Sequence, residues 1–125
     1  MNTVEKKIIS IGGGGFTHQT DKIIDEFVIN QKNNRKIKFG FLPTASKDNI
    51  NKIKLFYEEL KKYDLELSHF ELCSKVKSFS NWIMDQDIIY VGGGNTNFML
   101  DLWQKNKLYK NFKYAYNSGI ILSGV

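Results

Sequence analysis

The sequence has 125 residues, of which 42% are hydrophobic and 25% charged. This balance predicts one folded domain over residues 1–125 and excludes a disordered tail or a collagen-like chain. No apolar run reaches the roughly 18 residues of a membrane span, and no secretory leader is visible, so we expect a cytoplasmic protein with no membrane partner. The single cysteine, Cys73, excludes an internal disulfide and a thiolate-rich metal site, and we expect it to be buried and reduced.

The net charge is +5 and the isoelectric point about 9.2. Such a balance raises the question of a nucleic-acid partner. Arg35 is the only arginine, however, so lysines supply 17 of the 18 basic residues. Arginine is the residue that reads guanine through two hydrogen bonds and stacks on bases. We therefore predict no specific nucleic-acid partner.

The first third of the chain alternates between strand and helix patterns. Residues 7–11 form a short β-branched apolar run that stops at the four glycines 12–15, which predicts a strand buried on both faces. Apolar residues at three- and four-residue spacing predict a helix over about 20–31. Residues 36–42 are a second apolar run and predict the second strand.

The middle third repeats this alternation. An apolar stripe over residues 50–60 predicts a helix, for which Ser46 or Asp48 is a candidate N-cap. Residues 65–70 alternate in polarity and predict a third strand. A short helix is expected through residues 79–83.

The last third contains two further strands. Residues 87–91 predict a strand that ends in the glycine-rich segment 92–96. Helices are expected over about 97–104 and 108–116, and a fifth strand over 119–123. Strands that alternate with helices through short links predict an α/β fold with a parallel sheet and helices on both faces. In such sheets ligands bind at the carboxyl ends of the strands, where both glycine clusters fall.

The first glycine cluster does not match a nucleotide-binding motif. In G-x-G-x-x-G counted from Gly12, the third glycine position is Thr17, and Leu42-Pro43-Thr44 stands where an acidic residue would be needed. We therefore interpret these glycines as a tight backbone turn. No cofactor or metal motif is found, so no cofactor and no metal ligand are predicted.

The second cluster, Gly92-Gly93-Gly94-Asn95-Thr96, is more informative. Glycines after a buried strand leave backbone N–H groups accessible, and the start of the next helix adds partial positive charge. This pattern indicates an oxyanion hole or a carboxylate cradle. Helix capping by Asn95 or Thr96 is the structural alternative, and these residues alone do not decide between the two.

The last strand breaks into glycine at Gly124, as a strand does when it enters a nucleophile elbow. Ser123 does not fit G-x-S-x-G, because Ile121 and Val125 occupy the glycine positions. It lies within the strand, so we interpret Ser123 as a structural residue.

Segments 89–96 and 119–125, together with Phe41-Leu42-Pro43-Thr44-Ala45, resemble the peptidase E (aspartyl dipeptidase) family. That resemblance implies a class I glutamine amidotransferase-like, flavodoxin-like three-layer fold, here incomplete at the C-terminus. In the family the last strand enters a G-x-S-A-G elbow. Matching Gly124-Val125 to G-x places the nucleophilic serine immediately after Val125. The family's histidine and acid follow the elbow, so none of the three lies in this sequence.

The resemblance assigns roles only to the glycine-rich segment. Gly94 would supply the oxyanion-hole N–H, Gly93 would assist, and Asn95 and Thr96 would support the loop or touch substrate. His18 and His69 are the only histidines, and neither has a nucleophile that it is expected to activate. We expect both to have structural or solvent-exposed roles.

The resemblance implies a serine peptidase that cleaves short peptides, with N-terminal aspartyl dipeptides as the family's substrates. This chain alone is predicted to be inactive, because it lacks the nucleophile. Two alternatives remain open: a non-catalytic flavodoxin-like module that binds a small anion at residues 92–96, and an amidotransferase-like accessory domain. An uncovered sheet edge would also favour self-association.

Overall fold

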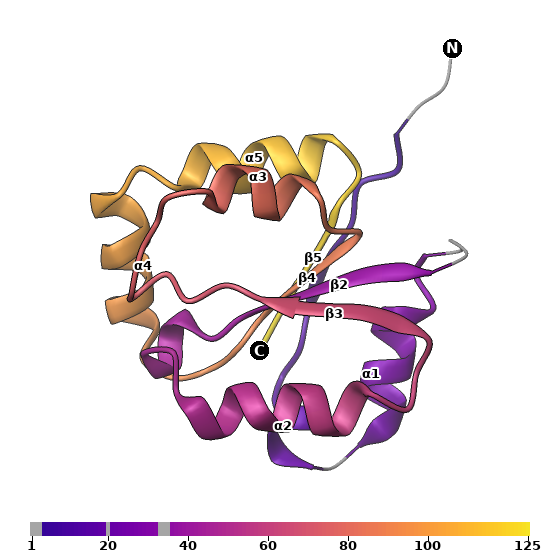
Figure 1. Ribbon diagram of the computed structural model, residues 1–125. Helices are drawn as coiled ribbons and strands as arrows, with labels where there is room; N and C mark the ends of the chain where they lie inside the picture. The colour runs from indigo at the N-terminus through magenta and orange to yellow at the C-terminus, as the bar shows by residue number, and fades with distance from the viewer. Residues whose placement is uncertain (1–3, 20, 33–35) are drawn as a thin grey trace.

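The protein is a five-stranded parallel sheet, described by a computed structural model over residues 4–19, 21–32 and 36–125 (Figure 1). The strand order is β1-β5-β4-β2-β3, and every pair of neighbours runs parallel. The strands are β1 (Ile8–Ser10), β2 (Ile37–Leu42), β3 (Leu65–His69), β4 (Ile88–Val91) and β5 (Ile121–Gly124). The predicted α/β fold with a parallel sheet is confirmed.

The helices form a layer on each face of the sheet, as Figure 1 shows. Below the sheet in that view lie α1 (Lys22–Ile29) and α2 (Ile50–Leu60), and above it lie α3 (Phe79–Met84) and α5 (Tyr109–Asn117). Helix α4 (Thr96–Lys105) stands at the end where the strands finish. Two 3₁₀ turns, η1 (Phe16–His18) and η2 (Thr44–Ser46), follow β1 and β2. No helix among the described residues is long and apolar enough to cross a membrane.

The core on the α1/α2 face is aromatic. Phe16 of η1 packs edge-on against Phe41, with ring centroids 5.3 Å apart, and against Tyr90 at 4.7 Å. Phe56 of α2 stacks on Phe41 at 5.0 Å. All four rings are buried, so η1, α2 and the two middle strands are held together at the carboxyl end of the sheet.

The core on the α3/α5 face joins α4 to the sheet. Trp103 and Phe112 have ring centroids 4.2 Å apart, and both belong to one buried cluster with Leu42 and Ile89. Alternate residues of the central strands thus point to opposite faces. This packing fixes α4, and therefore the loop that precedes it, against the ends of β2 and β4.

Strand β1 is not buried on both faces, so that prediction was wrong. Among the described residues it is an edge strand whose one neighbour is β5, and Ile8 is 65% exposed. An apolar run of three residues cannot distinguish a central strand from an edge strand, because sheet order depends on contacts distant in sequence.

The N-cap of α2 also differs from expectation. Asn49 accepts hydrogen bonds from the backbone N–H groups of Asn51 (3.0 Å) and Lys52 (3.1 Å). Ser46 instead donates its hydroxyl to the carbonyl of Pro43, and Asp48 accepts from the backbone N–H of Cys73. Ser46, Asp48 and Asn49 are all residue types that cap helices, so the sequence alone does not decide which one caps α2. Tertiary contacts decide it.

Candidate active site

The glycine-rich loop 92–96 lies at the carboxyl end of β4, next to the segment that follows β2. The Gly92 N–H donates to the carbonyl of Leu42 at 3.0 Å. A Cβ on Gly92 would lie 2.9 Å from the Phe41 ring, so only glycine fits in this position. The loop is therefore positioned by the first residues beyond β2.

Gly94 has a backbone conformation and a close contact that both require glycine. Its φ is +147°, and a Cβ would lie 2.6 Å from the carbonyl carbon of Ala45 and 2.9 Å from the N of Ser46. The next amide, of Asn95, donates to the carbonyl of Ala45 at 2.7 Å. The loop is thus fixed against η2 with almost no room for adjustment.

The peptide between Gly93 and Gly94 has a defined orientation. The carbonyl of Gly93 accepts a hydrogen bond from Lys52 Nζ of α2 at 3.3 Å. In a trans peptide the N–H points opposite to the preceding carbonyl, so the Gly94 N–H points away from Lys52. Among the described residues the Gly93 and Gly94 amides donate no hydrogen bond, and Gly94 is exposed. This amide is available to an incoming acceptor.

Asn95 is the N-cap of α4. Its side-chain oxygen accepts from the backbone N–H of Phe98 at 2.9 Å, and Thr96 is the first helical residue. Asn95 therefore caps the helix, which was the structural alternative to a role in anion binding. The same cap directs the positive end of the α4 dipole to the region just beyond Gly94.

The last residues of the chain lie beside this loop. Val91 of β4 pairs with Gly124 of β5, and the Val125 N–H donates to the carbonyl of Val91 at 3.2 Å. A Cβ on Gly93 would lie 3.6 Å from Val125 Cγ1. The end of β5 therefore lies next to Gly93.

Ser123 has a structural role, as its position in the strand predicts. It is 3% exposed, and its hydroxyl donates to the carbonyl of Ile89 at 2.8 Å. The hydroxyl thus links β5 to β4 within the sheet and faces a backbone acceptor, not the loop.

The two histidines lie away from the glycine loop. His69, at the end of β3, has both ring nitrogens engaged: Nδ1 lies 2.6 Å from the Tyr57 hydroxyl, and Nε2 lies 3.0 Å from Glu71 Oε2. His18 is exposed, and its Nδ1 lies 3.2 Å from the carbonyl of Gly14. The expected structural or exposed roles agree with these contacts.

Cys73 is exposed, so the prediction of a buried thiol was wrong. The residue lies in a turn after β3, where its backbone N–H donates to Asp48 Oδ2 at 2.8 Å. Partial burial and the neighbouring Asp48 carboxylate raise the pKa of the Cys73 thiol to about 11. The thiol is therefore protonated at neutral pH, which makes it a poor nucleophile.

The first glycine cluster forms a tight turn, as interpreted from the sequence. Gly13, Gly14 and Gly15 all have positive φ, and a Cβ on Gly15 would lie 3.1 Å from the Tyr90 hydroxyl and 3.2 Å from Asp25 Oδ1. Asp25 is buried and accepts a hydrogen bond from the Phe16 N–H at 3.2 Å. Burial raises the pKa of Asp25 to about 6, although that hydrogen bond opposes the shift. This turn therefore packs closely against the buried Tyr90 and Asp25.

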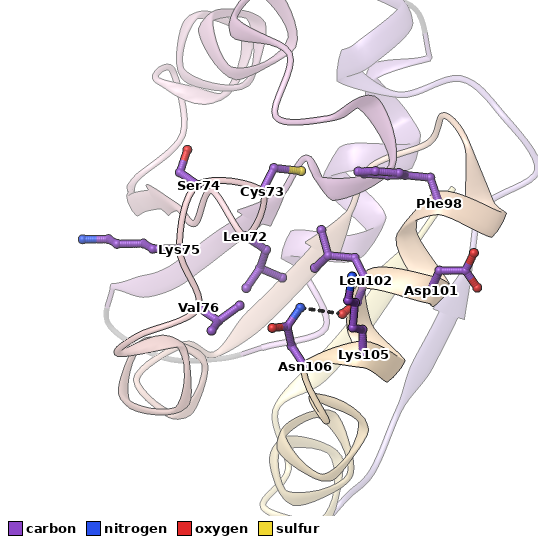
Figure 2. Close-up of a pocket in the computed structure, with 10 residues that line it drawn as sticks. All are labelled: Leu72, Cys73, Ser74, Lys75, Val76, Phe98, Asp101, Leu102, Lys105 and Asn106. Carbon is purple, nitrogen blue, oxygen red and sulfur yellow. Dashed lines mark hydrogen bonds between the residues drawn. The ribbon is translucent and has the colours of Figure 1, made fainter.

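A hollow of about 520 Å³ lies between the turn 72–76 and α4 (Figure 2). Its lining includes Cys73, Phe98, Asp101 and Lys105, so charges of both signs face it. No residue of the loop 92–96 lines this hollow. We place the candidate site at the glycine-rich loop instead, because Gly94 is exposed and its amide donates no hydrogen bond among the described residues. Within the described part of the chain, no group of three or more His, Cys, Asp or Glu side chains could hold a metal ion.

Sequence reasoning missed two groups that shape the loop. The carbonyl of Ala45 receives the Asn95 amide, and Lys52 fixes the Gly93 carbonyl. Both residues are distant in sequence from their partners in the loop, Lys52 by 41 residues from Gly93, and neither residue type signals such a contact. Only the pairing of β2 with β4 brings them there.

Residues 8–125 match the sequence profile of peptidase family S51. The chain belongs to this family. The uncharacterised peptidase YgaJ of Bacillus subtilis (strain 168) is 37% identical over 122 residues, which are 96% of this chain and 53% of that relative. The resemblance to peptidase E is thereby confirmed at the level of the family.

Solved structures of two proteins share this fold over nearly the whole chain. A candidate peptidase E protein from Listeria monocytogenes EGD-e superposes with a TM-score of 0.71 at 20% identity, over 95% of this chain and 57% of that protein. A peptidase from an acI-B1 actinobacterium gives 0.67 at 19% identity, over 94% and 52%. The S51 chain described here thus spans about half the length of these relatives.

Proposed function

We propose that this chain carries the oxyanion-binding half of a serine-type peptidase that hydrolyses short peptides. Gly94 supplies the N–H that receives the substrate's carbonyl oxygen, and Gly93 is the second donor. Asn95 and Thr96 hold the loop at the start of α4. The nucleophile is a serine directly after Val125, and the histidine and acid come from the part of the fold that the longer relatives have. The enzyme acts in the cytoplasm.

One juxtaposition carries this proposal. The end of β5 lies beside the glycine loop, with the Gly93 Cβ position 3.6 Å from Val125 Cγ1, while the Gly94 amide has no protein acceptor among the described residues. An oxyanion hole needs an unused N–H within hydrogen-bond reach of the carbonyl that the nucleophile attacks. The proximity of Val125 to Gly93 supports a nucleophile at the residue that follows Val125.

The chemistry follows the acyl-enzyme route. The serine hydroxyl attacks the peptide carbon while the histidine takes its proton, and the carbonyl oxygen becomes an anion at the Gly94 N–H. The C–N bond then breaks, the amine leaves with the proton from the histidine, and water hydrolyses the ester in the same way. One such backbone donor contributes about 10² to 10³ in rate.

Acidic peptides fit the charges around the loop. Lys52 Nζ lies at the Gly93 carbonyl, and Lys47 Nζ lies 5.2 Å from the ring of Phe98 in the first turn of α4. Together with the helix dipole, these two lysines make the electrostatic potential around the loop positive. This supports the family's preference for an N-terminal aspartate as the substrate class.

The position of the nucleophile is tested with a full-length hybrid, in which this chain is continued by the part of YgaJ that it does not match. A fluorophosphonate should label the first residue after Val125, as read by peptide mass spectrometry, and labelling should abolish aspartyl-dipeptide hydrolysis. Label at Ser123 or at any other residue contradicts the proposal. Binding of small anions without hydrolysis would favour the flavodoxin-like module, and activity only with a separate synthase chain would favour the accessory domain.

A further inference from the structure

The backbone carbonyl of Gly93 accepts a hydrogen bond from a charged group. Lys52 of α2 donates from Nζ to this oxygen at 3.3 Å. Among the described residues, no backbone N–H donates to the same oxygen. In that part of the chain the Lys52 ammonium also forms no ion pair with a carboxylate. Its positive charge is therefore directed at the glycine loop and is not neutralised by a neighbouring side chain.

The start of α2 holds Lys52 at this place. Its backbone N–H donates to the side chain of the N-cap residue, Asn49, at 3.1 Å. One turn later Phe56 is fully buried and stacks on Phe41 of β2. The Lys52 side chain itself is half-buried. The backbone from which the ammonium reaches Gly93 is thus fixed to the same strand end that positions the loop.

The carbonyl that Lys52 contacts belongs to the same peptide group as the Gly94 N–H. Resonance couples the oxygen and the N–H of one peptide. A cation at the oxygen draws electron density away from the nitrogen, so the N–H becomes a stronger donor. Within the described residues the Gly94 N–H has no acceptor. The charge of Lys52 therefore acts on a donor that is still unused.

We propose that Lys52 is a positioning residue of the oxyanion hole, which holds and polarises the Gly93–Gly94 peptide. The inference rests on the proposed function and adds a residue to it. As the substrate's carbonyl oxygen becomes negative, its hydrogen bond with the Gly94 N–H strengthens. The bond between Lys52 and the Gly93 carbonyl strengthens with it, because both polarise the same peptide in the same direction. Lys52 acts in this way without touching the substrate.

This role differs from simple attraction of an acidic substrate by the lysine charge. Attraction acts equally on the bound substrate and on the transition state, so its loss raises KM and leaves kcat unchanged. Polarisation of the Gly94 N–H matters most when the oxyanion has formed, so its loss lowers kcat. The two kinetic constants therefore separate the two roles of Lys52.

The kinetic test uses the full-length hybrid with YgaJ and aspartyl dipeptides. Lys52→Met removes the charge and should keep the fold, because the first turn of α2 disfavours a cation. It should lower kcat about tenfold, a fraction of what a whole backbone donor contributes, and change KM less than about twofold. Lys52→Arg keeps the charge and should recover about half of the wild-type kcat or more. The control Lys54→Met, at an exposed position of the same helix, should behave as the wild type.

A spectroscopic test uses the 125-residue chain and needs no turnover. In NMR spectra, Lys52→Met should move the amide proton of Gly94 upfield, because its N–H is less polarised. Lys52→Arg should restore its position, and Lys54→Met should leave it unmoved. The Asn95 amide, which donates to the carbonyl of Ala45 at 2.7 Å, reports whether the loop keeps its place and should not shift in any variant.

The role of Lys52 is overturned if Lys52→Met changes KM alone, if it leaves both kcat and the Gly94 amide proton unchanged, or if the Gly94 and Asn95 amides shift together. The last result would mean that Lys52 only maintains the shape of the loop. Failure of the proposed function looks different, because the wild-type hybrid would then hydrolyse no dipeptide. An active wild-type hybrid whose Lys52→Met variant keeps its kcat contradicts the role of Lys52 alone.

Discussion

At the scale of single residues, the backbone conformation of Gly94 determines the direction of the amide that the proposed function uses. The carbonyl of Ala45 occupies the space that a Cβ on Gly94 would need. Lys52 donates a hydrogen bond to the carbonyl of Gly93, the residue before it. The free amide is therefore held in one direction before any substrate arrives. Such preorganisation is what makes a backbone donor effective in stabilising an anionic transition state.

Replacement of Gly94 by alanine should destabilise the protein by about 2 to 4 kcal/mol, because the new Cβ would overlap Ala45 and the positive φ is unfavourable. Gly93→Ala is the matched control. Its Cβ would meet only Val125 at ordinary contact distance, so a loss below about 1 kcal/mol is expected. Urea unfolding of both variants checks this pair, and equal losses would mean that the loop is not positioned as described.

Asp25 should make stability decrease as the pH rises. Its carboxyl group ionises near 3.8 when unfolded and near 6 when folded. Between these values the folded state binds more protons, so raising the pH costs about 1 to 3 kcal/mol by pH 7.

Asp25→Asn removes that cost and keeps an acceptor for the Phe16 N–H. The free energy of unfolding of this variant, measured from pH 4 to 8, should therefore exceed that of the wild type near pH 7. The exposed Asp64→Asn serves as the control and should follow the wild-type slope. A wild-type curve that rises with pH over this range, and is matched by Asp25→Asn, would show that the carboxyl is not buried.

At the scale of elements, strands and helices could be predicted almost to their ends, because apolar runs bounded by glycine and stripes at helical spacing are local signals. The order of the strands in the sheet could not be predicted in this way. The run at β1 carries the same apolar signal as the buried run at β4, yet Ile8 is exposed while Ile88 is fully buried. What differs is the neighbour on the far side, and no residue within the run encodes it.

The glycine-rich loop could be singled out from the sequence, but the residues that position it could not. Residues 92–96 stood out because a glycine run after a buried strand and before a helix has few purely structural uses. Their partners Ala45 and Lys52 did not stand out, since an alanine carbonyl and a lysine amine carry no motif. Their contribution depends on the β2–β4 pairing, which is a tertiary feature.

The N-cap of α4 gives a prediction at this scale. Asn95→Ala removes the acceptor of the Phe98 N–H and should cost about 1 kcal/mol of stability. Asn97→Ala, two residues on and exposed, should change stability by less than about 0.5 kcal/mol. Thermal or urea unfolding measures both. If the two variants prove indistinguishable, Asn95 is free to contact substrate and is not engaged as the cap.

At the scale of the whole molecule, the described residues build five paired strands, with the glycine-rich loop at the carboxyl end of β4. The proteins that the chain matches are about twice as long as this chain. In the proposed function, the nucleophile is a serine that follows Val125 and acts beside the Gly94 amide.

The chain alone should show no hydrolysis of aspartyl dipeptides at any pH, since the proposed function places the nucleophile after Val125. A sensitive coupled assay for released amino acid measures this. Ser123→Ala should leave the blank unchanged, because that hydroxyl is bonded to Ile89. Turnover by the wild type that disappears in Ser123→Ala would place the nucleophile inside β5.

The Gly94 amide itself provides the most direct measurement. In the full-length hybrid with YgaJ, the amide proton of Gly94 is followed by NMR before and after reaction with a fluorophosphonate, whose phosphonyl oxygen mimics the oxyanion. We predict a single adduct on the residue after Val125 and a marked downfield shift of the Gly94 amide, with that of Gly119 unmoved. An adduct that leaves the Gly94 amide unshifted would contradict its role as the oxyanion donor.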